Sequence, residues 1–138
     1  MQVVDVLSMR TIIRCRDLAA SRTFWERDLG LTVAREYGTA GTVTGVVLFA
    51  GGGYVELTAG GAPERASRMA AGAGSIWLQV ADVRAEEARL VGVGVPIDQP
   101  STVMPWGLVE CWLADPDGVP IVLVETPPDH PLRRRLDT

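Results

Sequence analysis

The sequence predicts an α+β fold built from two βαβββ modules. Two stretches, residues 10–31 and 75–95, share one plan: an apolar strand, an aspartate, a helical stretch and a glycine. Each stretch is followed by three strand-like runs without a further helix. A chain of 138 residues, 47% of them hydrophobic, can bury enough apolar surface for one domain built from two such halves.

The first module is expected over residues 8–59. Its helix should begin at Asp17, whose carboxylate can accept the free amides of the first turn, and should end at Gly30. The strands that follow are LTVAREYG, TVTGVVLFA and GYVELTA, separated by GTAG and GGG. A stripe of residues at helical spacing supports the helix: Leu18, Ser21, Trp25 and Leu29.

The second module is expected over residues 75–127, after a linker of small residues at 60–74 and before a tail at 128–138. Its helix should begin at Asp82 and end at Gly94. The helix stripe consists of Val83, Leu90 and Val91. The strands are VPIDQPST, LVECWLA and VPIVLVET, separated by the turn sequences MPWG and DPDG.

Composition and charge argue against several classes of function. Arginine supplies all 13 basic residues against 17 acidic ones, and a net charge of −4 argues against nucleic acid as a partner. The two cysteines are far apart, so no CxxC zinc site or disulfide framework is indicated. The only histidine, His130, lies in a proline-flanked tail, which argues against Ser-His-Asp or Cys-His catalysis. With no signal peptide and no apolar run of membrane-spanning length, we expect a cytoplasmic protein without membrane contact.

Four segments follow one another over most of the chain: RDLAASRTFWERDLGL, GYVELT, SIWLQVADV and PWGLVECWLADPDGVPIVLVE. Their order and spacing resemble those of the vicinal oxygen chelate superfamily, which includes glyoxalase I, the bleomycin-resistance proteins and the extradiol dioxygenases. The resemblance implies that the two modules form a cup-shaped, mostly antiparallel mixed sheet around an open cavity. It is greatest to the metal-free, bleomycin-resistance-like branch.

The metal-dependent relatives place one ligand, normally His, Glu, His and Glu, on each of four cup-facing positions. At the corresponding positions this chain has Arg10, Glu56, Ser75 and Val122. One carboxylate beside a guanidinium, an alcohol and an isopropyl group cannot bind a divalent metal with useful affinity. We therefore expect no metal and no other cofactor, and neither glyoxalase I nor extradiol chemistry.

Because side chains alternate along a strand, these four positions also identify the other residues that face the cup. Arg10 and Glu56 should form an ion pair, and Trp106 of the MPWG turn should lie at the rim. Glu110 and Trp112 share a face, and Trp112 is expected to point inward. The candidate ligand-binding residues are Arg10, Arg14, Tyr54, Glu56, Ser75, Trp77, Gln79, Trp106, Trp112 and Val122.

An aromatic lining with few polar groups favours a small-molecule binding protein that sequesters a planar, partly aromatic natural product or antibiotic, as in self-resistance. The alternative is a metal-independent isomerase or lyase, with Glu56 as acid or base and Arg14 or Arg10 stabilising an oxyanion. A neighbouring arginine would lower the pKa of Glu56 and weaken it as a base. A regulatory or scaffolding domain without a ligand is the third possibility. Because a shallow cup exposes apolar surface, we also expect a homodimer with ligand sites near its interface.

Overall fold

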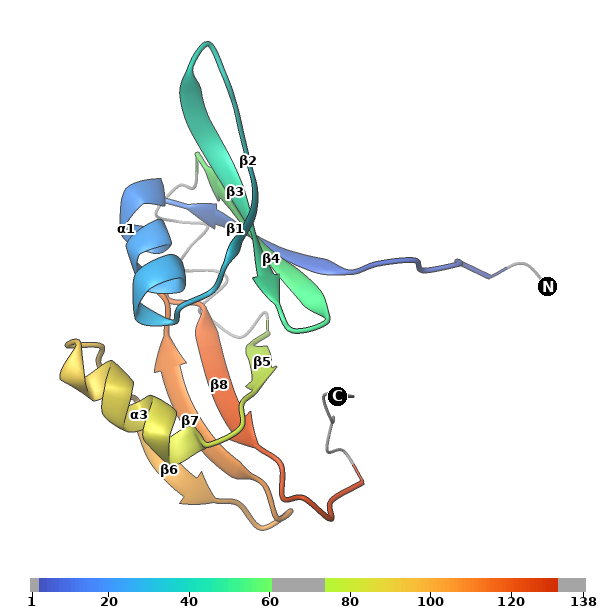
Figure 1. The fold of residues 1–138 in the computed structure, drawn as a ribbon, viewed down its shortest axis with the longest axis vertical. Coiled ribbons are helices and arrows are strands. Elements are labelled where there is room, and N and C mark those ends of the chain that lie inside the picture. Colours follow the sequence, from blue (N-terminus) through green and yellow to red (C-terminus); the bar gives the residue numbers. More distant parts are fainter. Residues whose placement is uncertain (1–2, 61–73, 132–138) are drawn as a thin grey trace. The chain divides into compact units, whose positions relative to one another are not determined.

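The computed structural model describes residues 3–60 and 74–131. The chain divides into two compact units, Met1–Ala66 and Ser67–Thr138. Within the described residues, each unit has a four-stranded mixed sheet and one helical segment, which confirms the α+β class and the two βαβββ modules (Figure 1). Most of the expected linker (61–73) and the end of the expected tail (132–138) lie outside the described residues.

In the first unit the helical segment lies between the first and second strands. The sheet order is β1-β4-β3-β2; β1 runs parallel to β4, and the other neighbouring pairs are antiparallel. The three later strands lie where the sequence predicts them. The elements are β1 (Arg10–Cys15), α1 (Leu18–Arg22), η1 (Thr23–Asp28), β2 (Val33–Thr39), β3 (Thr42–Ala50) and β4 (Gly53–Ala59).

The second unit repeats this topology with the sheet order β5-β8-β7-β6, in which β5 is parallel to β8. Strand β6 begins at Gln99, later than the VPIDQPST run predicts. Within β6, Pro100 lies where the ladder with β7 shifts register, between Gln99 and Thr102, as expected for a residue without an amide proton. The elements are β5 (Ile76–Gln79), α3 (Val83–Gly92), β6 (Gln99–Val103), β7 (Val109–Ala114) and β8 (Pro120–Glu125).

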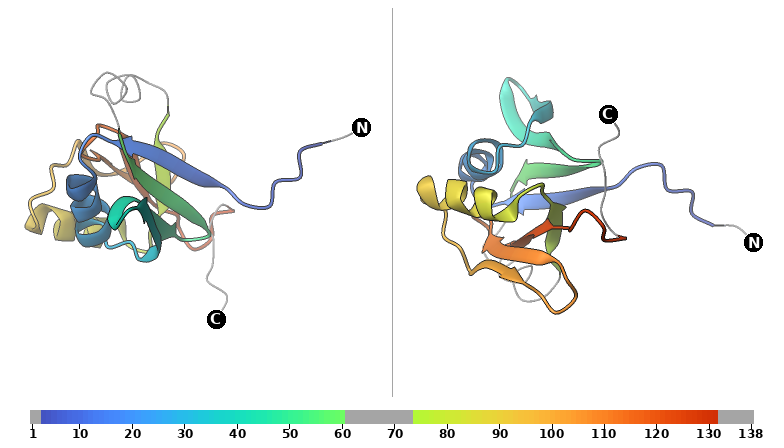
Figure 2. Two further views of the ribbon diagram at one scale, coloured as in Figure 1. Left: turned by 90° about the horizontal axis from the view of Figure 1, so that it is seen from above. Right: turned by 60° about the horizontal axis from the view of Figure 1, so that its bottom comes forward.

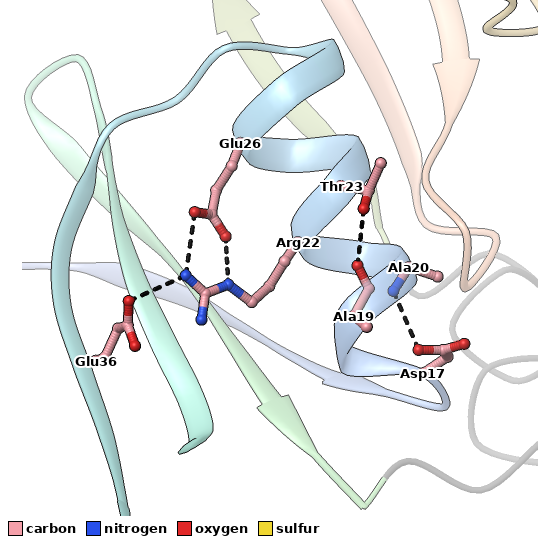
Figure 3. Close-up of polar contacts among 7 residues, drawn as sticks. All are labelled: Asp17, Ala19, Ala20, Arg22, Thr23, Glu26 and Glu36. Atoms are coloured by element: carbon pink, nitrogen blue, oxygen red, sulfur yellow. Dashed lines mark hydrogen bonds and ion pairs between the residues drawn. The ribbon is translucent and has the colours of Figure 1, made fainter. Parts of the chain in front are cut away.

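Both helical segments begin and end where the sequence predicts. The carboxylate of Asp17 accepts a hydrogen bond from the amide of Ala20 at 3.0 Å, as Figure 3 shows. Asp82 accepts in the same way from Ala85, also at 3.0 Å. Gly30 and Gly94 follow the helices with φ of 81° and 87°, a left-handed conformation that a side chain would disfavour.

The first helical segment widens after one turn, which the sequence pattern does not predict. Over Thr23–Asp28 it is a π-helix, and the amide of Leu29 donates to the carbonyl of Phe24 at 2.8 Å. The rings of Phe24 and Trp25 are both buried and meet edge to face, with centroids 5.6 Å apart. Phe24, which lies off the expected stripe, therefore joins Trp25 in the core.

Arg22 ties this helical segment to the sheet (Figure 3). Its guanidinium donates to Glu26 one turn later and, at 3.1 Å, to Glu36 on β2. Both carboxylates raise the pKa of Arg22. Because Glu36 faces α1, the neighbouring Tyr37 must lie on the other face of the sheet.

Helix α3 packs against β6, β7 and β8. Glu125 of β8 accepts from the amide of Val83 at 3.0 Å, and Glu87 accepts from the hydroxyl of Ser101 at 3.0 Å. Val83 and Leu90 are fully buried, as expected from the stripe. The expectation for Val91 is wrong: it is 59% exposed, because one residue beyond Leu90 is rotated by about 100° around the helix.

Each sheet therefore has one face buried under its helix and one face that carries the candidate site residues. On the buried face of the first sheet, alternate strand residues form the core: Ile13, Cys15, Val46, Leu48, Val55 and Leu57. The corresponding core residues of the second sheet are Cys111, Leu113, Ile121 and Leu123. Burying one such aliphatic side chain stabilises the fold by about 1.5–3 kcal/mol.

Residues 3–9 precede β1 as an extended segment that runs away from its sheet in each view (Figures 1 and 2). Its apolar side chains are highly exposed, with Leu7 at 91% and Val4 at 87%. Across the described ranges, the structure contains no helix of the length and apolarity needed to cross a membrane.

Candidate functional site

The first unit places four of the expected site residues on one face of its sheet. In the parallel pair, Arg10 lies beside Tyr54, and Arg14 lies beside Thr58. Glu56 shares this face, because it is two residues from Tyr54 on the same strand. The alternation assumed from the sequence is therefore present within this unit.

Glu56 is the centre of the polar contacts on this face. Its Oε1 accepts from the Arg10 guanidinium at 2.8 Å, which confirms the expected ion pair. Its Oε2 accepts from the Tyr37 hydroxyl of β2 at 2.9 Å. The guanidinium also lies over the ring of Tyr54, 5.6 Å from the centroid.

Tyr37 is a residue that the sequence analysis did not identify. Its ring crosses β3 at Gly45, its cross-strand partner. A Cβ on Gly45 would lie 2.1 Å from the ring, so the contact requires glycine at this position. The turn alone does not give this contact, since the ladder between β2 and β3 shifts register between Tyr37 and Gly38, and this shift places Tyr37 opposite Gly45.

These contacts determine the charge state of Glu56. The hydrogen bond from Arg10 lowers the pKa of the carboxyl below its usual range, and the Tyr37 hydroxyl lowers it further. Partial burial acts in the opposite direction but is outweighed. Glu56 is therefore an ionised carboxylate at neutral pH and accepts two hydrogen bonds.

The second unit carries the other six expected residues on or beside one face of its sheet. Trp77 of β5 lies beside Val122 of β8, and Gln79 lies beside Val124. Val122 also pairs with Trp112 of β7. The remaining two are Ser75, which immediately precedes β5 and is exposed, and Trp106, in the turn between β6 and β7.

Glu110 joins two of these tryptophans, a role that the sequence analysis did not assign. Its Oε2 accepts from the Trp106 indole N–H at 2.9 Å, and its Oε1 accepts from that of Trp112 at 3.0 Å. The residue is only 7% exposed, whereas Trp106 is 55% exposed. Trp112 packs against the buried cluster of Leu108, Val122 and Val124. The i, i+2 spacing predicts that Glu110 and Trp112 share a face. It does not predict that both indole N–H groups donate to Glu110.

The residues at the four positions that correspond to metal ligands do not fit a metal. Glu56 is the sole carboxylate among them, and both of its oxygens are already bonded, to Arg10 and to Tyr37. The side chain of Val122 has no donor atom. Elsewhere in residues 3–60 and 74–131, no group of three or more His, Cys, Asp or Glu side chains is arranged to bind a metal ion.

Comparison with known proteins supports the family resemblance. A family model described as the Glyoxalase/Bleomycin resistance protein/Dioxygenase superfamily matches residues 7–123. Among solved structures, UcmS2 is 19% identical with a TM-score of 0.73, and 89% of this chain and 100% of that chain are covered. TioX from Micromonospora sp. ML1 is 24% identical with a TM-score of 0.69, covering 86% and 97%.

A lactoylglutathione lyase from Agrobacterium tumefaciens is also similar, at 19% identity and a TM-score of 0.63, covering 88% of this chain and 95% of that one. At these identities the likeness shows a shared fold. A search of curated proteins gave no significant match.

Proposed function

We propose that this chain, which belongs to the Glyoxalase/Bleomycin resistance protein/Dioxygenase superfamily, sequesters a planar, partly aromatic small molecule, such as a natural product or antibiotic, without a metal. Such a protein confers resistance by binding the compound, and no chemical step is required. The observation that carries the proposal is the aromatic face of the second unit.

That face combines exposed indole surface with a small number of polar groups. Trp77 is 48% exposed and Trp106 is 55% exposed, although both side chains are large and mostly apolar. Stacking of a planar ligand on such a ring contributes about 0.5–1.5 kcal/mol beyond the burial of surface. Ser75 and Gln79 flank Trp77 along the strand and could orient polar groups of the ligand.

In the first unit, Arg14 and Tyr54 are the residues we assign to ligand contact. Arg10 is already bonded to Glu56 and lies over the Tyr54 ring. Arg14 is exposed on the same face and is the better candidate to bind an anionic or carbonyl group. Arg10 and Glu56 then act mainly as an internal ion pair that keeps this face ordered.

The alternative, a metal-independent enzyme with Glu56 as acid or base, has weaker support. The lowered pKa of Glu56 and its two hydrogen bonds make it a poor base near neutral pH. Cys111 is no better as a nucleophile, because burial and the charge of Glu87 raise the pKa of its thiol to about 11.

The proposal is tested by titrating the protein with a panel of planar antibiotics and following tryptophan fluorescence, with mass spectrometry of the recovered ligand. We expect saturable quenching and an unchanged ligand mass. Trp77→Ala should weaken binding by about 1–3 kcal/mol, and Trp77→Phe, which keeps a ring, should weaken it less. A changed ligand mass would instead support the enzyme, and unchanged affinity in folded Trp77→Ala would remove Trp77 from the site.

A further inference from the structure

Glu110 lies on the inner strand β7 (Val109–Ala114), on the face of the second sheet that carries Trp112 and Val122. The residue is 7% exposed, and each of its carboxylate oxygens accepts one indole N–H, at 2.9 Å and 3.0 Å. Both donors are neutral. The hydrogen bonds therefore orient the two rings, and neither of them brings a positive charge to the carboxylate.

Glu56 on the corresponding face of the first unit provides the contrast. There the carboxylate is paired with the Arg10 guanidinium at 2.8 Å. In the part of the chain that the structure describes, Glu110 has no such cation. Its cross-strand neighbours are Val124 on β8 and Thr102 on β6, and both are uncharged.

A desolvated carboxylate is costly unless a cation approaches it. The faces of the tryptophan rings attract cations as well, because the π system is negative above and below its plane. Trp106 offers most of the accessible ring surface, and its N–H end is held against Glu110. A cation over this indole would be attracted by the ring and by the carboxylate at the same time.

We propose that Trp106, Glu110 and Trp112 form a recognition site for a cationic group, such as a protonated amine, an aromatic ring cation or a quaternary ammonium, carried by the aromatic ligand. This inference rests on the proposed binding function and specifies the ligand class. Glu110 supplies the charge and holds the planes of both rings, and Trp106 supplies the surface over which the cation lies. The excess of 17 acidic over 13 basic residues favours the same ligand charge.

The test compares two planar probes of the same ring system, 10-methylacridinium, a permanent cation, and acridine, which is neutral at slightly alkaline pH. Calorimetry with the wild-type protein should show at least about tenfold tighter binding of the cation. Glu110→Gln should abolish this preference, and the readout is the ratio of the two affinities, because Glu110 also orients both rings and its replacement lowers the affinity for acridine as well. Glu86→Gln makes the same charge change on α3, beside Arg89, and should retain the preference.

A second measurement needs no variant. Tetramethylammonium should displace 10-methylacridinium from the wild-type protein, and tert-butanol, a neutral molecule of similar shape, should not. Equal affinity for both acridines, equal displacement by both competitors or a cation preference that survives Glu110→Gln would each overturn the cation site. If both probes bind with equal affinity, the proposed function stands without the cation site. If neither the probes nor any antibiotic of the panel binds, the proposed function itself is wrong.

Discussion

Gly45 is the residue that allows Tyr37 to reach Glu56 across strand β3. The side chain that alanine would add lies 2.1 Å from the Tyr37 ring, a distance that the ring can relieve only by moving away. The hydrogen bond of 2.9 Å from Tyr37 to Glu56 would then be lost. A glycine here thus links backbone geometry directly to the polar contacts of the candidate site.

We expect Gly45→Ala to lower the free energy of unfolding by about 1–3 kcal/mol, measured by urea denaturation. Gly92→Ala is the matched control, because a Cβ at Gly92 meets no atom within 4 Å and the residue lies in helix α3. That substitution should be neutral or stabilising by up to about 1 kcal/mol. Equal effects of the two substitutions would contradict the proposed role of the Tyr37 contact.

The ion pair of Arg10 and Glu56 predicts a pH dependence of stability. The pKa of Glu56 is lower in the folded protein than its usual value of 4.5, which represents the unfolded chain. The interaction therefore stabilises the fold above about pH 4.5, and this contribution is lost as the pH falls through the folded-state pKa.

Arg10→Met should accordingly lower the free energy of unfolding at neutral pH, with a difference from wild type that shrinks in acid. Urea denaturation across this pH range measures the difference, and carbon-13 NMR of the Glu56 carboxyl should show a raised pKa in the variant. Arg84→Met, an exposed arginine on α3, is the control and should give a small, pH-independent change. If the free energy of unfolding of Arg10→Met stayed below that of wild type by the same amount at all pH values, this account would be contradicted.

At the scale of secondary structure, the beginning of α3 is attached to the second sheet by two acceptors. Asp82 accepts from the amide of Ala85, and Glu125 of β8 accepts from that of Val83. Between them they satisfy two of the amides that a helix N-terminus leaves without an intrahelical partner. The cap and the packing of Val83 therefore stabilise the same end of the helix.

Asp82→Ala should destabilise the protein by about 1 kcal/mol, within a range of about 0.5–2 kcal/mol, as measured by thermal or urea denaturation. Asp98→Ala removes an exposed aspartate outside the helix and should change stability by less than about 0.5 kcal/mol. If Asp82→Ala were as mild as its control, Glu125 and solvent would suffice to cap α3.

At the scale of the whole molecule, exposed apolar side chains predict self-association. Val4 and Leu7 in the segment before β1 are 87% and 91% exposed, and Trp77 and Trp106 are half exposed. Apolar side chains exposed to this degree within each unit favour a partner surface. A second copy of the same chain is the simplest partner, because a twofold arrangement covers the same surface on both copies.

Sedimentation at micromolar concentration should give a mass near twice 14.8 kDa. The double substitution of Val4→Asp and Leu7→Asp should weaken the dimer, because it places charges in the apolar segment, whereas Asp5→Asn should not. A wild-type protein that stays monomeric while binding its ligand fully would rule out shared sites at a dimer interface but would not affect the fold.

Several features followed from the sequence alone because they depend on local physics. The family resemblance assigned Arg10, Glu56 and Val122 to one face, and alternation along strands extended that assignment to Arg14, Tyr54 and Trp77, since the side-chain period of a strand is fixed by backbone geometry. The caps at Asp17 and Asp82 and the glycines after each helix were equally predictable from the free groups at helix ends.

Other features were decided by tertiary structure. The π-helix at Thr23–Asp28 and the exposure of Val91 depend on how each helix packs on its sheet, which the apolar pattern does not specify. The contact of Glu56 with Tyr37 joins different strands, and Glu110 accepts from Trp106 in the preceding turn and from Trp112 on its own strand. Such pairings follow from strand register and side-chain direction together, so the charge balance of the candidate site was determined only when the chain folded.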